Sequence, residues 1–119
     1  MNRDESRNEL GVLRIHKNVI SSISSIAAAE IEGVKRVGRD LKSGLLELVG
    51  KKFSSAIKVD ISKHEEVKVQ IPLIIKYGYN IPEIANRVQE NVRLALEKMS
   101  NLSIKEINVN VQGIERGEE

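Results

Sequence analysis

The sequence predicts an α+β domain of two layers, a mixed or antiparallel sheet with two long helices on one of its faces. Apolar residues recur at steps of three and four in residues 17–31 and 81–99, which is typical of helices with one buried face. Apolar and polar residues alternate in residues 56–61, 66–77 and 104–113, which is typical of strands with one buried face. With a further short strand and a short helix, the expected order is strand, helix, short helix, strand, strand, helix, strand.

The first half of the chain is expected to begin with a short strand over residues 10–15 and to continue into the first long helix. The apolar stripe of that helix consists of Ile20, Ile23, Ala27 and Ile31, with Val19 and Ile26 beside it. Its outer face is expected to hold Ser21, Ser22, Ser24 and Ser25. Gly33 ends the helix, and Val34 is placed for the hydrophobic contact that often accompanies such an end. A short extended piece is expected over residues 34–37.

The middle of the chain is expected to form a short helix and then a hairpin. Residues 43–49 fit two helical turns that end at Gly50. Residues 56–61 and 66–77 pair most simply as an antiparallel hairpin across the polar turn between them. Pro72 lies inside the second of these strands and has no N–H to donate, so we expect a bulge or a locally unpaired edge there.

The second long helix has the clearest start. Asn80 can accept hydrogen bonds from first-turn N–H groups, Pro82 needs no partner for its nitrogen, and Glu83 lies three residues after Asn80 to complete a capping box. The expected core stripe of this helix consists of Ile81, Ala85, Val88, Val92, Ala95 and Met99. The strand over residues 104–113 completes the unit, and its expected buried face consists of Ile107, Val109 and Val111.

Length and composition predict one domain. The 119 residues suffice for a real core, with a flexible polar tail over residues 1–9, a domain over residues 10–114 and an acidic tail over residues 115–119. Because the chain has no cysteine, neither a disulfide scaffold nor a cysteine-ligated metal is expected. The start of the sequence lacks the apolar run of a signal peptide, and no apolar run approaches the ~20 residues of a membrane span. These features predict a cytoplasmic protein.

No residue pattern predicts catalysis, a cofactor or a metal. Residues 44–52 resemble a phosphate-binding loop, but five residues separate the glycines instead of four, and Lys52 stands where that loop has Ser or Thr. His16 and His64 are the only histidines, and neither has a neighbouring histidine or cysteine to complete a metal site. We therefore expect no enzyme activity, no catalytic residue, no cofactor and no metal.

Two candidate surfaces remain. The first is a candidate anion-binding set that consists of Lys35, Arg36, Arg39, Lys42, Lys51 and Lys52. A solvated loop is the simpler interpretation of this set, and the lack of interleaved aromatic residues argues against base stacking. The second is a candidate protein interface at Leu94, which falls outside the core stripe among Arg87, Glu90 and Asn91. An ordinary surface leucine is the alternative there.

Residues along most of the chain carry a family resemblance. In the first half they are Gly11, Val19, Ile20, Ala27 and Gly33–Val34. In the second half they are Tyr77–Gly78, Ile81, Glu83, Ala85, Val88–Gln89, Val92, Met99, Leu102, Ile107–Asn108–Val109, Val111 and Gly113–Ile114. On these residues the chain resembles the alkaline shock protein family of Gram-positive bacteria, small cytoplasmic proteins linked to envelope stress. Asn101 departs from the glycine that family members often have, although Asn also tolerates a left-handed backbone.

The resemblance implies a non-enzymatic protein-interaction module of the bacterial stress response. It also implies two kinds of partner, a membrane-anchored protein that holds the chain near the membrane and further copies in a homo-oligomer. Two alternatives stay open: a binding module for nucleic acid or anionic membrane through the basic residues 35–52, and a regulator of a lipid-metabolic kinase, which rests on resemblance alone. We expect no specific nucleic-acid recognition and no direct membrane insertion. A compact monomer of this length should have a radius of gyration of about 13–14 Å.

Overall fold

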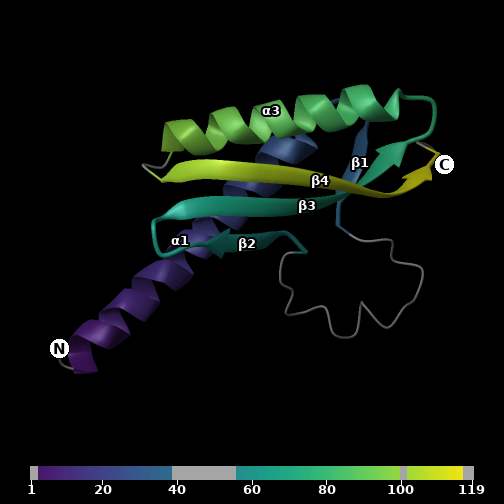
Figure 1. Ribbon diagram of the computed structural model, residues 1–119. Helices are drawn as coiled ribbons and strands as arrows, with labels where there is room; N and C mark the ends of the chain where they lie inside the picture. The colour runs from purple at the N-terminus through teal and green to yellow at the C-terminus, as the bar shows by residue number, and fades with distance from the viewer. Residues whose placement is uncertain (1–2, 39–55, 100–101, 117–119) are drawn as a thin grey trace, which may run out of the picture.

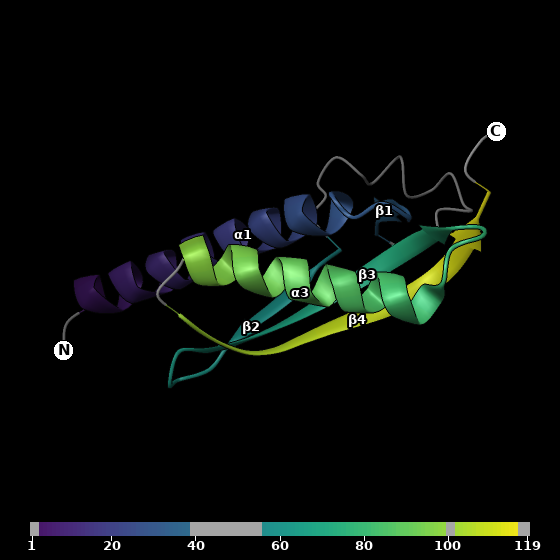
Figure 2. The same cartoon turned by 90° about the horizontal axis from the view of Figure 1, so that it is seen from above.

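A mixed four-stranded sheet carries both long helices on one face, so the predicted two-layer α+β class is confirmed (Figure 1). The computed structural model describes the backbone of residues 3–38, 56–99 and 102–116, and the side chains of these ranges from residue 16 onward. Its elements are α1 (Arg3–Ala29), β1 (Val34–Val37), β2 (Lys58–Ile61), β3 (Glu66–Lys76), α3 (Ile81–Met99) and β4 (Ser103–Glu115). The two helices lie side by side and run in opposite directions (Figure 2). The expected short helix over residues 43–49 lies outside the described residues.

Strand β3 is the centre of the sheet because the three other strands all pair with it. β4 runs parallel to β3 from Glu66, opposite Ser103, to Lys76, opposite Glu115. β2 and β1 run antiparallel to β3 and share its other edge, one after the other. Helix α3 provides the crossover that the parallel β3–β4 pair requires. The expected hairpin is confirmed as the β2–β3 pair.

Pro72 lies at a point of β3 where neither β1 nor β2 pairs with it. β2 pairs with β3 as far as Gln70, and β1 begins to pair with it at Leu73. The missing N–H of proline therefore removes no bond to either strand, while the carbonyl of Pro72 accepts from the N–H of Gly38 at 2.9 Å. Among the strands that the structure describes, the expected locally unpaired edge is confirmed.

Helix α1 is longer than expected, and the expected strand over residues 10–15 is wrong. These residues lie inside α1, which begins at Arg3, so residues 3–9 of the expected flexible tail are helical as well. Periodicity alone cannot assign a short apolar run to strand or helix, and Gly11 lowers the helix propensity of this one. Continuity with the strongly one-sided helix that follows favours the helical backbone.

The chain leaves α1 through a tight turn at Gly33. α1 ends at Ala29, and Gly33 has a φ of 105°, in the left-handed region that glycine adopts most readily. A Cβ at this position would lie 2.7 Å from the Cδ1 of Ile84 and 2.9 Å from the ring of Tyr79. Glycine is therefore required both for the turn and for the close approach of the start of α3. The carbonyl of Gly33 accepts from the N–H of Lys76, which joins this turn to the end of β3.

The core lies between β3 and the two helices. The residues of β3 that face the helices are fully buried, namely Val67, Val69, Ile71, Leu73 and Ile75. The helices contribute Ile20, Ala27 and Ala28 from α1 and Ile84, Val88, Val92 and Leu96 from α3. The same cluster is completed by Val34, Ile57 and Ile107. The core therefore fills the space between the sheet and the helix layer.

The buried stripe of α3 is rotated relative to the expected one. Val88 and Val92 are buried as predicted, but Met99 is 65% exposed, and Ile84 and Leu96 take deep positions in its place. Both stripes fit a helical period, because the apolar residues of α3 cover more than one side of the helix. Contact with the sheet and with α1 selects the stripe that is buried, and the sequence does not reveal where α1 lies.

One serine of α1 also lies on an unexpected side. Ser24 is fully buried, whereas the sequence placed it on the outer face with Ser21, Ser22 and Ser25. It lies four residues after Ile20, so it falls on the buried stripe of the helix. The hydroxyl of Ser24 has no hydrogen-bond partner in the described part of the chain.

The predicted role of Asn80 as the cap of α3 is confirmed, whereas the carboxylate of Glu83 contacts Arg87 and not the N–H of Asn80 that a capping box requires. The side-chain oxygen of Asn80 accepts from the N–H of Glu83 at 3.0 Å. The carbonyl of Asn80 also accepts from the N–H of Ile84, the first backbone bond of the helix. The carboxylate of Glu83 forms an ion pair with Arg87 at 2.6 Å, one turn further along.

Candidate interaction surface

Leu94 is exposed on the outer side of α3, as the sequence predicts. It keeps 52% of its accessible surface. Leu94 lies four residues after Glu90 and three residues after Asn91, so the three side chains project from the same half of the helix. Arg87, the remaining member of the predicted interface, is exposed and bound to Glu83.

Asn91 does not belong to an outer interface, so this part of the prediction is wrong. Its side-chain amide is half-buried and donates to the carbonyl of Ala27 at 2.8 Å and to the carboxylate of Glu30 at 3.1 Å. The carbonyl of Ala27 belongs to the last turn of α1, where the helix supplies no partner of its own. Asn91 therefore joins α3 to the end of α1. The sequence does not reveal this role, because it does not show which helix lies beside Asn91.

Two apolar residues of α1 are exposed on the side of α1 that lies next to α3. Ile26 is 64% exposed and lies four residues before Glu30, which contacts Asn91. Val19 lies two turns before Ile26 on the same side and is 45% exposed. The packing of the helices thus brings exposed apolar residues of α1 to the same outward surface as Leu94.

A hollow of about 500 Å³ lies where α1 passes the C-terminal end of α3. Its lining consists of His16, Val19, Ile20, Glu65, Lys98, Met99 and Leu102. Val19 of α1 and Met99 of α3 both line this hollow, so they occupy the same end of the helix pair. We call the outward-facing exposed apolar residues of the helices the helix-layer patch, which consists of Val19, Ile26 and Leu94. Met99 is exposed as well, but it lies seven residues after the buried Val92 and therefore projects from the sheet-facing side of α3, at its end.

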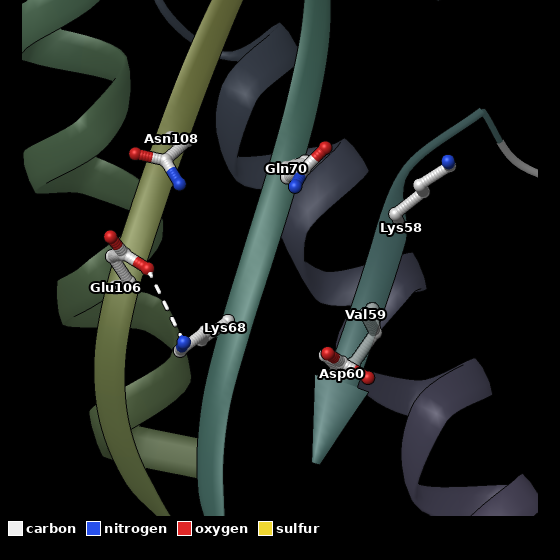
Figure 3. Close-up of a pocket in the computed structure, with 7 residues that line it drawn as sticks. All are labelled: Lys58, Val59, Asp60, Lys68, Gln70, Glu106 and Asn108. Atoms are coloured by element: carbon white, nitrogen blue, oxygen red, sulfur yellow. Dashed lines mark ion pairs between the residues drawn. The ribbon is translucent and has the colours of Figure 1, made fainter. Parts of the chain in front are cut away.

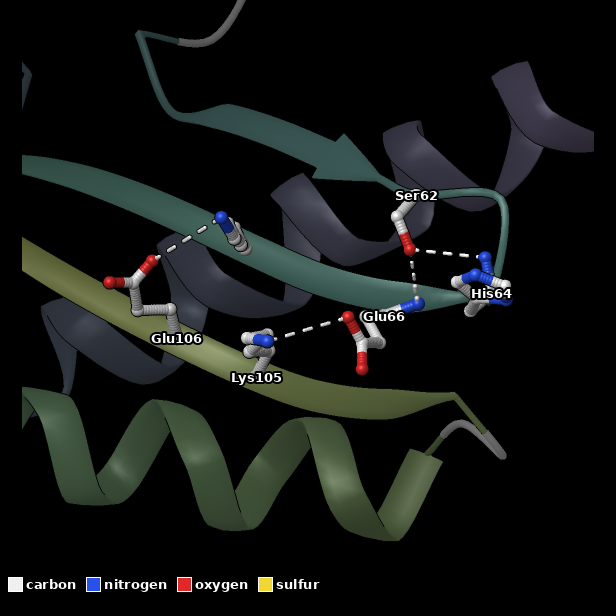
Figure 4. Close-up of polar contacts among 6 residues, drawn as sticks. Ser62, His64, Glu66, Lys105 and Glu106 are labelled. Atoms are coloured by element: carbon white, nitrogen blue, oxygen red, sulfur yellow. Dashed lines mark hydrogen bonds and ion pairs between the residues drawn. The ribbon is translucent and has the colours of Figure 1, made fainter.

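The turn between β2 and β3 forms one wall of this hollow and has a fixed shape. The hydroxyl of Ser62 accepts from the N–H groups of His64 and Glu66 (Figure 4). The carboxylate of Glu66 in turn contacts the ammonium group of Lys105 on β4 at 3.6 Å. Glu65 has a φ of 64°, which is uncommon for a residue with a side chain. These contacts hold Glu65 at the hollow in spite of its unfavourable backbone.

The two histidines occupy different settings. His16 is exposed at the hollow, and His64 is exposed in the β2–β3 turn. Among the side chains of residues 16–38, 56–99 and 102–116, no three histidine, aspartate or glutamate residues converge as metal ligands do. The expectation that the protein uses no metal stays a prediction.

The face of the sheet opposite the helices is polar (Figure 3). Its hollow of about 360 Å³ is lined by Lys58, Val59, Asp60, Lys68, Gln70, Glu106 and Asn108. Asp60 lies opposite Lys68 in the β2–β3 register, and Lys68 contacts Glu106 of β4 at 4.0 Å. Neighbouring charges therefore compensate one another across this face.

Only part of the predicted anion-binding set falls in the described residues. Those outside are Arg39, Lys42, Lys51 and Lys52. Arg36 of β1 forms a bidentate ion pair with Glu115 of β4, with distances of 2.8 and 3.0 Å. Hydrogen bonding from Arg36, with the charges of Arg36 and Lys35, holds the pKa of Glu115 below its usual value. The charge of Arg36 is thus compensated within the fold, which weakens the anion-binding hypothesis at this residue.

Two side chains that the sequence analysis missed fix α3 to β4. Gln89 donates to the carbonyl of Ile107 at 2.6 Å, and Arg93 donates to the carbonyl of Ile104 at 3.2 Å. Gln89 and Arg93 lie four residues apart on the side of α3 that faces β4. The four-residue spacing of Gln89 and Arg93 is visible in the sequence, but the position of β4 beside these two residues is not. With Asn91 bound to α1, both flanks of α3 are occupied and the side with Leu94 faces outward.

Two tyrosines mark the opposite end of the helix pair, just before α3 begins. Tyr79 donates to the carboxylate of Glu32 at 3.0 Å, and this hydrogen bond raises the pKa of Tyr79 above its usual value. Tyr77 is 66% exposed, and the guanidinium carbon of Arg116 lies 5.1 Å from the centre of its ring. Tyr77 is therefore an exposed apolar residue remote from the helix-layer patch.

These features define a small α+β domain with exposed apolar residues on the outer side of its helix pair. The chain belongs to the alkaline shock protein 23 family, which is described by a cell envelope-related function and whose model matches residues 5–116. The sequence resemblance to the alkaline shock proteins is confirmed at the level of the family.

Two relatives illustrate the extent of this similarity. The chain is 34% identical over 113 residues to YqhY, an uncharacterized protein of Bacillus subtilis (strain 168), covering 94% of this chain and 83% of that protein. It is 28% identical over 113 residues to YloU, an uncharacterized protein of the same strain, covering 92% and 93% respectively. The similarity therefore extends over most of the length of both relatives.

Similarity to solved structures concerns the fold. The copper form of MamM CTD is similar with a TM-score of 0.59 and 14% sequence identity, covering 87% of this chain and 92% of that chain. At this identity the likeness shows the fold alone. Separately, no helix in the described part of the chain is long and apolar enough to cross a membrane.

Proposed function

We propose that this chain is a protein-interaction module with a cell envelope-related role, and that the helix-layer patch is its contact surface. The family description supports the envelope-related role. The observation that carries the choice of surface is that both helices expose large apolar residues on the same outward side. The proposal includes that the module acts by contact, with no reaction, cofactor or metal of its own.

The energetics favour a contact that uses the patch as a whole. Burying one large apolar side chain completely contributes about 1.5–3 kcal/mol, and each residue of the patch is already partly covered. Association costs at least about 4 kcal/mol in lost freedom, so one leucine cannot support a complex. Several neighbouring apolar residues together can exceed this cost, which is why the patch is more informative than Leu94 alone.

Site-specific photo-crosslinking in the source cells tests the choice of surface. A photoreactive amino acid replaces Leu94 or Ile26 in the helix-layer patch, and Gln70 on the polar sheet face serves as the matched exposed control. We expect crosslinked protein from the two helix positions and none from Gln70. Crosslinks from Gln70 with none from the helix positions would overturn the assignment of the surface.

We further propose a cytoplasmic location close to the membrane, reached through a protein partner. The family description and the sequence resemblance support this proposal. Cell fractionation tests it, because a protein held by a partner is released from membranes by alkaline carbonate, whereas an inserted protein is not. Material that stays with the membrane after this wash would contradict the proposal.

A further inference from the structure

We propose that the outer edge of β4, at Val109 and Val111, binds an extended segment of a different protein, which adds a strand to the sheet. The residues of this segment alternate between β-branched apolar and uncharged polar side chains. This contact surface goes beyond the proposed function, because it lies at the edge of the sheet and not on the helix-layer patch.

β4 is an edge strand in the described part of the chain. It is 13 residues long, and it pairs with β3 along one of its two sides. Figure 2 shows β4 at the border of the sheet, with β3 beside it. The backbone N–H and C=O groups at the unpaired edge of a strand can pair with another extended chain. The outer edge of β4 therefore has the groups that such a partner requires.

Backbone hydrogen bonds near the end of β3 show which of its residues face β4. The C=O of Pro72 accepts from the N–H of Gly38, which follows β1, so Pro72 directs its C=O toward the side of β1. The N–H of Tyr77, five residues later, donates to the C=O of Glu115 on β4 at 2.7 Å. Because the backbone groups of successive strand residues point to alternate edges, the odd-numbered residues of β3 pair with β4.

This pattern determines the direction of the backbone groups of β4. Ile71 lies opposite Val109, and Leu73 lies opposite Val111. In a parallel pair, a residue bonds to the two residues that flank its partner, and the partner itself directs its N–H and C=O groups to the opposite edge. Val109 and Val111 therefore present these groups at the outer edge, where no strand of the described residues pairs with them.

α3 covers the beginning of this edge and leaves Val109 open. The C=O of Ile107, which points in the same direction as that of Val109, accepts from Gln89 of α3. The next residue along this side of α3 is Ala85, four residues before Gln89, and its methyl group cannot donate a hydrogen bond. Four helical residues and two strand residues each span about 6–7 Å, so Ala85 lies level with Val109. The cover of the edge by α3 side chains therefore ends before Val109.

The side chains along this edge indicate the chemistry of the partner. Val109 and Val111 are half-buried on the helix side of β4, and the exposed side chains of the other side are the amides of Asn108, Asn110 and Gln112. Cross-strand pairs are favourable when β-branched residues meet apolar neighbours and when polar residues can hydrogen-bond to one another. Residues 107–112 include no charged residue and no proline, which commonly protect edge strands. An uncharged alternating segment therefore suits both sides of β4.

A bulge after Val111 favours an extended segment over the edge of a second copy. The register of β4 shifts between Val111 and Gly113, and Ile114, opposite Ile75, is the next residue with outward backbone groups. Two folded copies would carry the same bulge and the same side-chain cover at Ile107, which limits their match to the short run between these points. A segment without a fold of its own can follow the edge past the bulge to Ile114, which is 49% exposed.

Amide hydrogen exchange of the full chain, followed by NMR, tests this edge. The probe is a short blocked peptide of alternating threonine and valine, N-methylated at each threonine so that only its valine edge can pair. With saturating peptide, we expect the amides of Val109 and Val111 to exchange at least ~10-fold more slowly. Asn110, whose N–H already pairs with β3, should be unchanged, and a peptide N-methylated at every residue should have no effect. Unchanged exchange at both valines would overturn the inference.

Two substitutions at one position separate the backbone from the side chain. Val109→Pro removes an N–H that points away from β3, so it removes no bond within the sheet. Val109→Ala loses the same valine side chain but keeps the N–H. We expect Val109→Pro to bind a labelled probe peptide about 10-fold more weakly than Val109→Ala, measured by fluorescence anisotropy, with circular dichroism to confirm folding. Equal affinities would overturn the inference, and the exchange measurement on the unsubstituted chain tests it even if Val109→Pro does not fold.

Measurements on the free chain identify the other occupants. Slow exchange of Val109 and Val111 at every concentration would show that the edge is already covered within one copy, and would overturn the inference. Protection that grows with concentration, with a radius of gyration above the 15.9 Å of one copy, would assign the edge to a second copy and would also overturn it. Leu94→Glu should leave peptide binding unchanged, so a failure of the helix-layer patch in crosslinking is distinguishable from a failure of this edge.

Discussion

The two faces of β3 are buried by different means. On the side of the helices, Ile71 and its neighbours along the strand are fully buried under α1 and α3. On the opposite side, Lys68 and Gln70 are exposed, yet Ile74 is fully buried although α1 and α3 both lie on the far side of the sheet. Ile74 is not part of the cluster that includes Ile71, so the strand carries two separate buried regions.

An ion pair crosses β3 next to Ile74. Arg36 lies opposite Ile74 in the β1–β3 register, and its guanidinium reaches Glu115 on β4, the strand at the other edge of β3. Gly113 is the β4 residue opposite Ile74, and a Cβ there would lie 3.6 Å from the Cδ1 of Ile74. The aliphatic part of Arg36 can cover apolar surface while its charged end is paired. The comparison teaches that, among the described residues, the neighbours of Ile74 on this face are the Arg36–Glu115 ion pair and Gly113, whereas the neighbours of Ile71 on the other face are the two long helices.

The largest expected effect is on the helix side of the strand. Ile71→Ala removes a fully buried side chain from a core packed on several sides, so the cavity cannot collapse easily. We expect the free energy of unfolding to fall by about 3–5 kcal/mol, measured by urea denaturation. The milder change Ile71→Val should cost about 0.5–1.5 kcal/mol.

The matching change on the face of β3 opposite α1 and α3 should lower the free energy of unfolding by less. Ile74→Ala leaves a space beside the Arg36–Glu115 ion pair, whose long side chains can move to fill it. We expect a loss of about 2–3 kcal/mol in the same urea experiment. A cost equal to that of Ile71→Ala would show that the two faces of β3 are packed equally rigidly.

A buried hydroxyl provides a smaller test on the helix side. Ser24→Ala removes a fully buried hydroxyl that has no hydrogen-bond partner in the described part of the chain. We expect unfolding to become about 1 kcal/mol less favourable, because the cost of burying an unsatisfied polar group disappears. Ser22→Ala, at an exposed position of the same helix, measures the contribution of helix propensity, and thermal unfolding of both variants isolates the burial effect. Equal gains from the two changes would contradict the interpretation.

The smallest expected effect is the pH dependence of the Arg36–Glu115 ion pair beside Ile74. Because the pKa of Glu115 is lowered from its usual value of 4.5 in the folded protein, the pair stabilises the fold above pH 4.5 and loses this contribution as the pH falls through the lowered pKa. Glu115→Gln should therefore be less stable than the parent chain at pH 7, and the difference should shrink steadily below pH 4.5. Urea denaturation at several pH values measures it. A difference that does not change with pH would show that Glu115 acts through packing alone.

The β3–α3–β4 unit and the start of the chain differ in how well the sequence predicts them. The alternation along β4 and the cap at Asn80 both appear in the structure as expected, since each depends on neighbouring residues. The strand expected over residues 10–15 is part of α1, because a short apolar run fits either period until its neighbours are known. The exposed position of Leu94 was predictable, but the adjoining Ile26 was not recognised as part of the same surface.

By itself, the sequence determined the α+β class, the one-sided strands and the exposed side of α3, because alternation, helical spacing and capping act over a few residues. Only the tertiary structure decided which stripe of α3 is buried, why Asn91 faces α1, and which residues join Leu94 on the outer surface. The physical reason is that each of these features depends on contacts between segments far apart in the chain. Two stripes of α3 satisfy the same period, and the packing of α1 and the sheet selects one of them.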